Sequence, residues 1–171
     1  GPSGGAGGLL GYAVLGGTST LRIADSDATG HVIGDYTGGL VGYLYAYDAD
    51  TITLDRVHAS GNVSGGYTSA GGLVGSGILA NGGTLAVNQA YATGHVTGTY
   101  NVGGLIGMVY AGGQVRMDVA YAAGNVTGTQ TGAGGLVGAV TLVGTGGAAL
   151  DLANAYAVGA VSGNDGVGGL V

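Results

Sequence analysis

The sequence has no cysteine, no tryptophan and no phenylalanine, and it has only one proline among its 171 residues. Without cysteine the chain cannot form disulfides, and this is compatible with a secreted bacterial protein. Collagen is excluded because its triple helix needs abundant proline as well as glycine at every third position. Charged residues make up 7% of the chain and hydrophobic residues 46%, which is the reverse of a disordered composition.

Lysine and glutamate are absent too, so all nine acidic residues are Asp and all three basic residues are Arg. These missing residues are the usual surface residues of helices. Val, Thr, Tyr and Ile dominate instead, separated by Asn, Asp and Gly, which favours many short strands. The net charge of −6 argues against nucleic acid as a partner, since no basic cluster could neutralise phosphates. No apolar run approaches the roughly 20 residues of a membrane span, so we expect no membrane insertion.

The chain is organised by an internal repeat, which is marked by two motifs. Gly-Gly-Leu begins at Gly7, Gly38, Gly71, Gly103, Gly134 and Gly168, and Ala-x-Gly-x-Val-x-Gly falls between successive copies. Aligned on the second motif, apolar residues form columns, such as Leu21, Ile52, Leu85, Val115 and Leu150 and the valines Val32, Val63, Val96, Val126 and Val161. Within each copy apolar residues alternate with other residues, which is the period-2 pattern of a strand with one buried face.

Three further features of the alignment carry structural predictions. The apolar phase slips by one residue after Asp55, Asn88 and Asp118, which predicts a corner or a bulge. A column of alanines predicts a tight interior corner: Ala28, Ala59, Ala92, Ala122 and Ala157. The leucines of the Gly-Gly-Leu motifs are predicted to point inward: Leu9, Leu40, Leu73, Leu105 and Leu136.

Short strands of this kind cannot bury their apolar faces alone, but stacking successive copies buries them and aligns equivalent residues along one axis. The predicted fold is therefore an all-β parallel β-helix (β-solenoid) of about five coils, each with about 32 residues and three short strands. Crossover chirality favours a right-handed coil. A glycine-rich β-sandwich or barrel is the alternative, although neither needs columns at this period. We assign residues 1–4 to a probable cloning remnant and residues 5–171 to a single solenoid, a fragment of a longer array.

The string Gly71-Gly72-Leu73-Val74-Gly75, followed by Ala90-Tyr91-Ala92-Thr93-Gly94 and continuing to Gly98, resembles the GLUG repeat of large bacterial surface and secreted proteins. Such repeats occur in filamentous-haemagglutinin-like adhesins, although family copies often carry a Cys where this chain has Ala90. The resemblance implies a β-helical segment that is extracellular or on the bacterial cell surface. It implies a structural or adhesive role, as a rigid stalk or a binding face, with no catalytic residues and no cofactor. The expected partner is an unspecified host-surface or extracellular glycan or protein.

The tyrosines are the most informative side chains for binding. Tyr91, Tyr121 and Tyr156 share one outward column, which His58 and Asp27 continue. The favoured interpretation is ring packing between coils, and the alternative is an exposed aromatic strip that binds carbohydrate or a partner. Three more tyrosines cluster after the second Gly-Gly-Leu motif, so the possible ligand-binding residues are Tyr43, Tyr45, Tyr47, Tyr91, Tyr121 and Tyr156.

The acidic and histidine residues suggest chemistry only weakly. Asp48 and Asp50 could form the carboxylate pair of a polysaccharide-active β-helix enzyme or a calcium site, but Asp is common in such polar turns for conformational reasons. His31 and His95 share a column two coils apart, roughly 10 Å at the usual strand spacing, so they cannot share a metal ion. We therefore predict an exposed polar ladder and no metal site. Asn62 and Asn125, in the same column, begin glycosylation sequons.

Two more expectations complete the analysis. The chain begins and ends at a Gly-Gly-Leu motif, which predicts exposed coil edges and end-to-end self-association. Ice binding needs a flat threonine array, and the best outward columns are broken by residues such as Ala123 and Val158.

Overall fold

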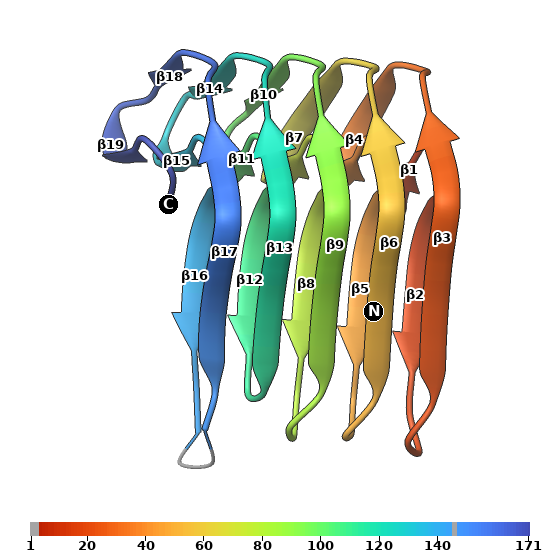
Figure 1. The fold of residues 1–171 in the computed structure, drawn as a ribbon. Coiled ribbons are helices and arrows are strands. Elements are labelled where there is room, and N and C mark those ends of the chain that lie inside the picture. The colour runs from red at the N-terminus through yellow and green to blue at the C-terminus, as the bar shows by residue number, and fades with distance from the viewer. Residues whose placement is uncertain (1–3, 145–146) are drawn as a thin grey trace.

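A computed structural model describes residues 4–144 and 147–171, and within these residues the regular structure is entirely β-strand. All strand pairs are parallel, and successive repeats stack as about five coils (Figure 1). The predicted parallel β-solenoid is thus confirmed. Gly1, Pro2 and Ser3 of the probable cloning remnant lie outside the described residues.

Each coil passes through three sheets. Sheet 1 contains β2 (Leu10–Leu15), β5 (Val41–Ala46), β8 (Val74–Leu79), β12 (Ile106–Ala111) and β16 (Val137–Leu142). Sheet 2 contains β3 (Thr20–Ala28), β6 (Thr51–Ala59), β9 (Thr84–Ala92), β13 (Gln114–Ala122) and β17 (Ala149–Ala157). Sheet 3 contains β1 (Gly5–Gly7), β4 (Val32–Gly38), β7 (Val63–Gly71), β10 (Val96–Gly98), β11 (Val102–Gly103), β14 (Val126–Gly128), β15 (Thr131–Gly134), β18 (Val161–Ser162) and β19 (Asp165–Gly168).

Sheets 1 and 2 lie face to face, and the short strands of sheet 3 cross one end of this pair (Figure 1). Register confirms the columns deduced from the sequence: Val96 pairs with Val63 on one side and with Val126 on the other. Equivalent residues of consecutive repeats therefore lie next to each other along the solenoid axis.

The main hydrophobic core lies between sheets 1 and 2, and a smaller cluster around Val63, Val96 and Val126 fills the space behind sheet 3. The motif leucines of the inner coils are fully buried, as predicted. Leu9 is an exception, because 53% of its surface is exposed. It belongs to the first coil, which has a neighbouring coil on one side only, so the inward prediction was wrong for this residue.

The phase slip within sheet 2 is a bulge that does not end the strands. At the residue after the polar column the backbone enters the left-handed region in every coil, with φ between 49° and 53° at Asp25, Arg56, Gln89, Val119 and Asn154. One left-handed residue reverses which side of the strand faces the core. Each nine-residue strand is therefore apolar inward at both of its ends.

The alanine column is tight because it packs directly against glycine backbone. A Cβ atom built on Gly39 would lie 2.7 Å from the Ala59 Cβ and 2.1 Å from the Gly72 carbonyl oxygen, and Gly72 meets Ala92 in the same way. Any larger side chain in the alanine column or the glycine column would overlap atoms of the same coil or of the next coil. This confirms the predicted interior corner.

Candidate functional site

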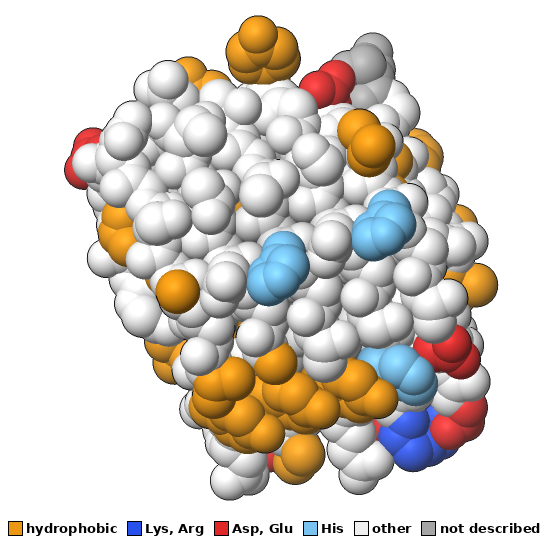
Figure 2. Space-filling model, turned by 90° about the horizontal axis from the view of Figure 1, so that it is seen from above, with side chains coloured by type: hydrophobic (Ala, Val, Ile, Leu, Met, Phe, Trp, Pro, Cys, Tyr) orange, Lys and Arg blue, Asp and Glu red, His pale blue; other side chains and the backbone are white. Residues whose placement is uncertain are grey.

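The outward column of sheet 2 forms one continuous row of stacked rings, which we call the tyrosine row. From His58 to Tyr91, Tyr121 and Tyr156 the ring centroids are 4.8, 4.9 and 5.1 Å apart, with interplanar angles of 7°, 7° and 3°. Figure 2 shows these side chains as a band of hydrophobic atoms beside a histidine. The predicted ring packing between coils is confirmed, and each such pair contributes about 0.5–1.5 kcal/mol.

This stacking decides which parts of the rings are accessible. Both faces of Tyr91 and of Tyr121 are covered by neighbouring rings, so these residues present mainly ring edges and hydroxyl groups to solvent. Burial raises the pKa of the Tyr121 hydroxyl above its usual value. Tyr156, with 51% of its surface exposed, ends the row in the last coil.

The second group of tyrosines packs at the corner between sheets 1 and 3. Tyr43 stacks on Tyr12 at 5.3 Å and meets the edge of Tyr36 at 4.9 Å, and only 4% of its surface is exposed. Tyr43 therefore cannot be part of an exposed strip, because Tyr12, Tyr36 and Tyr45 surround its ring. Burial and these neighbours raise its pKa to about 12. Tyr45 is half-buried, and Tyr47, which contacts it, is exposed.

The carboxylates of Asp48 and Asp50 are occupied by backbone groups of their own turn and of the turn below. Asp50 is fully buried; its Oδ1 accepts a hydrogen bond from Ser19 N at 2.6 Å, and its Oδ2 accepts one from Asp48 N at 3.2 Å. Asp48 Oδ2 accepts a hydrogen bond from Gly17 N at 3.0 Å. The two side chains thus join adjacent coils at a turn, as the conformational interpretation predicts. The described residues contain no group of three or more side chains able to hold a metal ion.

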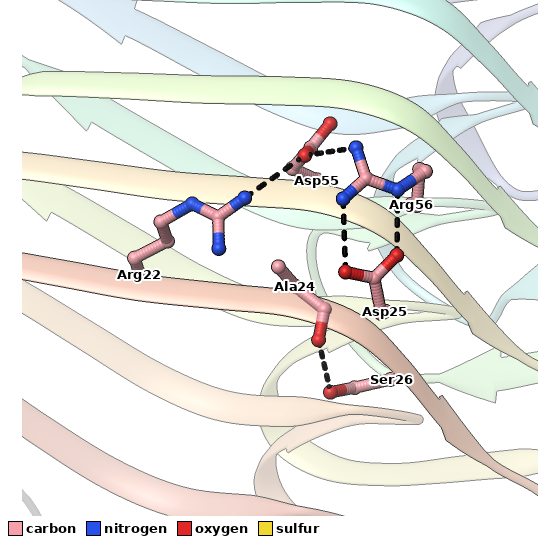
Figure 3. Close-up of polar contacts among 6 residues, drawn as sticks. All are labelled: Arg22, Ala24, Asp25, Ser26, Asp55 and Arg56. Atoms are coloured by element: carbon pink, nitrogen blue, oxygen red, sulfur yellow. Dashed lines mark hydrogen bonds and ion pairs between the residues drawn. The ribbon is translucent and has the colours of Figure 1, made fainter.

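A charged cluster that the sequence analysis did not identify lies beside the bulges of β3 and β6. The Arg56 guanidinium makes two hydrogen bonds to the Asp25 carboxylate, 2.6 Å from Oδ1 and 2.8 Å from Oδ2, and it also contacts Asp55, which Arg22 reaches at 3.2 Å (Figure 3). Arg56 holds the pKa of Asp25 below its usual value. The Arg56 and Asp25 side chains are 47% and 64% exposed, so this pair contributes little to stability. The repeat alignment contained the signal, since it places Asp25 and Arg56 in one column.

The predicted polar ladder runs along sheet 3. Each member accepts a hydrogen bond from the backbone N–H of the next: His31 from Asn62 at 3.1 Å, Asn62 from His95 at 2.9 Å, and His95 from Asn125 at 3.1 Å. Both histidines accept through Nδ1, so the neutral rings carry their proton on Nε2. The ladder caps backbone donors at the turn. The exposed Asn62 and Asn125 each use their carbonyl oxygen in it.

A pocket of about 310 Å³, which we call the corner pocket, opens where sheets 1 and 3 meet. Its lining residues come from four consecutive coils, and three of them are tyrosines outside the predicted set. The lining consists of Tyr36, Tyr67, Thr68, Ser69, Tyr100, Asn101, Met108 and Thr131. The repeat columns gave no signal for it, because Tyr67 lies in a segment where β7 has extra residues relative to its neighbours. In the register of β4 with β7, Gly34 pairs with Gly65 but Tyr36 pairs with Ser69.

Comparison with known proteins gives no relative: no family model, curated protein or solved structure matches the chain. In the part of the chain that the structure describes, no helix is long and apolar enough to cross a bilayer. The stacked parallel coils place the protein in the class of β-solenoids built from sequence repeats.

Proposed function

We propose that this chain is a structural and adhesive repeat segment of a bacterial cell-surface or secreted adhesin, acting as a rigid stalk or a binding face. The observation that supports the proposal is the unbroken register of the coils: each strand of one coil pairs in parallel with the equivalent strand of the next. At about 4.8 Å per coil, five coils extend the chain by roughly 24 Å along the axis. A longer array of such coils would project a binding surface away from the cell.

The chemistry of the surface is consistent with an adhesive role that needs no catalytic residue. The tyrosine row offers ring edges and hydroxyl groups over several coils. Tyrosine is favoured at interfaces because it combines a large apolar ring with a polar end. This observation also supports the second candidate function, a carbohydrate-binding module that uses the exposed tyrosines.

The experiment that tests the adhesive role couples the protein to beads and measures their retention under flow. The surfaces are cultured epithelial cells, the same cells treated with glycosidases, and immobilised extracellular-matrix proteins. Beads that carry the heat-denatured protein are the control. We expect retention above the control on at least one surface. Retention equal to the control on all of them would refute the binding-face role, although a stalk could still be tested by its resistance to proteases.

The enzyme alternative is tested separately, by release of reducing ends from a panel of polysaccharides. Because Asp48 and Asp50 bind backbone N–H groups, we expect no release by the natural sequence. Release that is lost in Asp48→Asn and Asp50→Asn would establish the carboxylates as catalytic and overturn the proposal.

We further propose that copies of these 171 residues associate end to end. The outermost strands β3 and β17 of sheet 2 each pair with one neighbour only. The outer coils also expose apolar side chains, with exposed fractions of 53% for Leu9 and 69% for Val158. Unpaired strand edges of this kind readily pair with another chain. Sedimentation velocity should show species larger than the monomer that grow with concentration; a monomer at every concentration would contradict the proposal.

A further inference from the structure

The corner pocket is built by a bulge of β7 that is hydrogen-bonded to the coils on both sides. Gly66, Tyr67 and Thr68 lie between Gly65, which pairs with Gly34, and Ser69, which pairs with Tyr36. The Asp35 carboxylate on the coil below accepts a hydrogen bond from Tyr67 N at 3.3 Å, and Gly66 O accepts one from Thr99 N of the coil above, also at 3.3 Å. Tyr67 lies within this bulge, and 81% of its surface is exposed.

Hydroxyl groups in this pocket lack protein partners. Only 2% of the surface of Ser69 is exposed, and its Oγ has no hydrogen-bond partner among the described residues. The Oγ1 of Thr68, the next lining residue, also has none. A buried polar group without a partner is unfavourable, and an ordered water is one way in which native proteins satisfy such a group. Ser69 and Thr68 therefore add polar groups to the wall of a pocket whose lining includes three tyrosines.

The remaining lining residues define the chemistry of the ligand. Among the eight described residues that line the pocket none is charged, which disfavours phosphates, sialylated glycans and other ions. Two of the three rings are exposed, 81% of Tyr67 and 39% of Tyr100, and the third, Tyr36, packs against Tyr43 in an edge-to-face pair. Asn101 adds an amide whose Nδ2 donates to the Met108 sulfur at 3.6 Å. Aromatic rings with hydroxyl and amide groups, and no charge, fit the alternating apolar faces and hydroxyl groups of a sugar.

We propose that the corner pocket binds a neutral glycan. Its volume of about 310 Å³ is at the lower end of the range for small-ligand sites, about 300–1,000 Å³, so it holds a short segment of a chain. A peptide that adds a strand is less suited, because β7, β11 and β15 at the pocket are already paired on both sides. The proposal deepens the adhesive role by naming the class of ligand. It also moves the carbohydrate site from the tyrosine row, whose inner ring faces are covered, to the pocket.

The test is binding of the 171-residue protein to an array of neutral cello-, manno-, galacto- and chito-oligosaccharides, followed by calorimetric titration of those retained. Tyr100→Ala is the principal variant, and Tyr110→Ala is its matched control, because the exposed fractions of the two residues are 39% and 40% and Tyr110 does not line the pocket. We expect Tyr100→Ala and Tyr67→Ala to weaken binding about tenfold or more, as for an aromatic hot spot, and Tyr110→Ala to leave it unchanged.

Ser69→Ala separates binding from folding. It removes a buried hydroxyl that has no hydrogen-bond partner among the described residues, so we expect the melting temperature to stay the same or rise. A fall in affinity at an unchanged melting temperature would support the pocket as the binding site. Binding that is lost in Tyr156→Ala but not in Tyr100→Ala would return the site to the tyrosine row and overturn the pocket proposal. A second outcome would also overturn the pocket proposal: no oligosaccharide of the array binds, and the beads are still retained on glycosidase-treated cells. That outcome would leave the adhesive function intact.

Discussion

Val119 should be the weakest position in the bulge column, and replacing it should stabilise the protein. It has φ of 53°, in a region that a β-branched side chain adopts only under strain, whereas the other residues of the column are Asp, Arg, Gln and Asn. A left-handed conformation costs an ordinary L-residue about 1–2 kcal/mol, and asparagine tolerates it best after glycine. Val119→Asn recovers most of this cost.

The gain is reduced by the apolar contacts of the valine. Half of the Val119 surface is exposed, so the substitution forfeits about half of the 1.5 kcal/mol that full burial of a valine contributes. The net change is a stabilisation of about 0.2–1.2 kcal/mol. For a domain of this size it corresponds to a rise in melting temperature of up to about 5 °C.

The assay is thermal unfolding followed by circular dichroism, with two matched variants. Val158→Asn changes another exposed valine, 69% against 50% for Val119, whose φ is not positive, so we expect no gain from it. Gln89→Val introduces a β-branched residue at φ of 49° and should lower the melting temperature. A Val119→Asn protein no more stable than the natural sequence, together with an unchanged Gln89→Val protein, would refute the assignment of strain to this column.

Three other predictions follow from the packing and the titratable groups. Gly61→Ala places a Cβ 1.9 Å from the Gly30 carbonyl oxygen, so it should lower the free energy of unfolding in urea by about 1–3 kcal/mol. The control Gly30→Ala meets nothing within 4 Å and should be neutral or slightly stabilising. Equal effects of the two substitutions would contradict the packing argument. Tyr43, whose pKa is raised from 10.0 to about 12, stabilises the fold fully below pH 10 and loses this contribution as the pH rises towards 12. Absorbance titration should therefore show one tyrosine that ionises near pH 12, absent in Tyr43→Phe. The Asp25 carboxyl, observed by NMR, should titrate below 3.8 because Arg56 stabilises its charged form, and Arg56→Gln should raise the midpoint; an unchanged midpoint would show that the ion pair does not form in solution.

The tyrosine row could be predicted because it depends on one relation alone, the register between equivalent positions of consecutive coils. Once Tyr91 and Tyr121 fall in the same aligned column, parallel stacking places their rings about one strand spacing apart, and the observed distance is 4.9 Å. The same relation predicted the valine columns, the alanine corner and the polar ladder. It also contained the pairing of Asp25 with Arg56, which a search for opposite charges within a column would have found.

What only the tertiary structure decided lies where different sheets meet. Tyr43 is buried because Tyr36, from sheet 3, closes over it, and an alignment of repeats says nothing about contacts between columns. The corner pocket depends on the extra residues of β7, which interrupt the repeat and turn Tyr67 outward. The sequence by itself thus determined the repeating coil, because in-register stacking buries the apolar side chains that recur at every period. The three-dimensional path of the chain determined the candidate binding site, because that site is formed where the repeat departs from its own period.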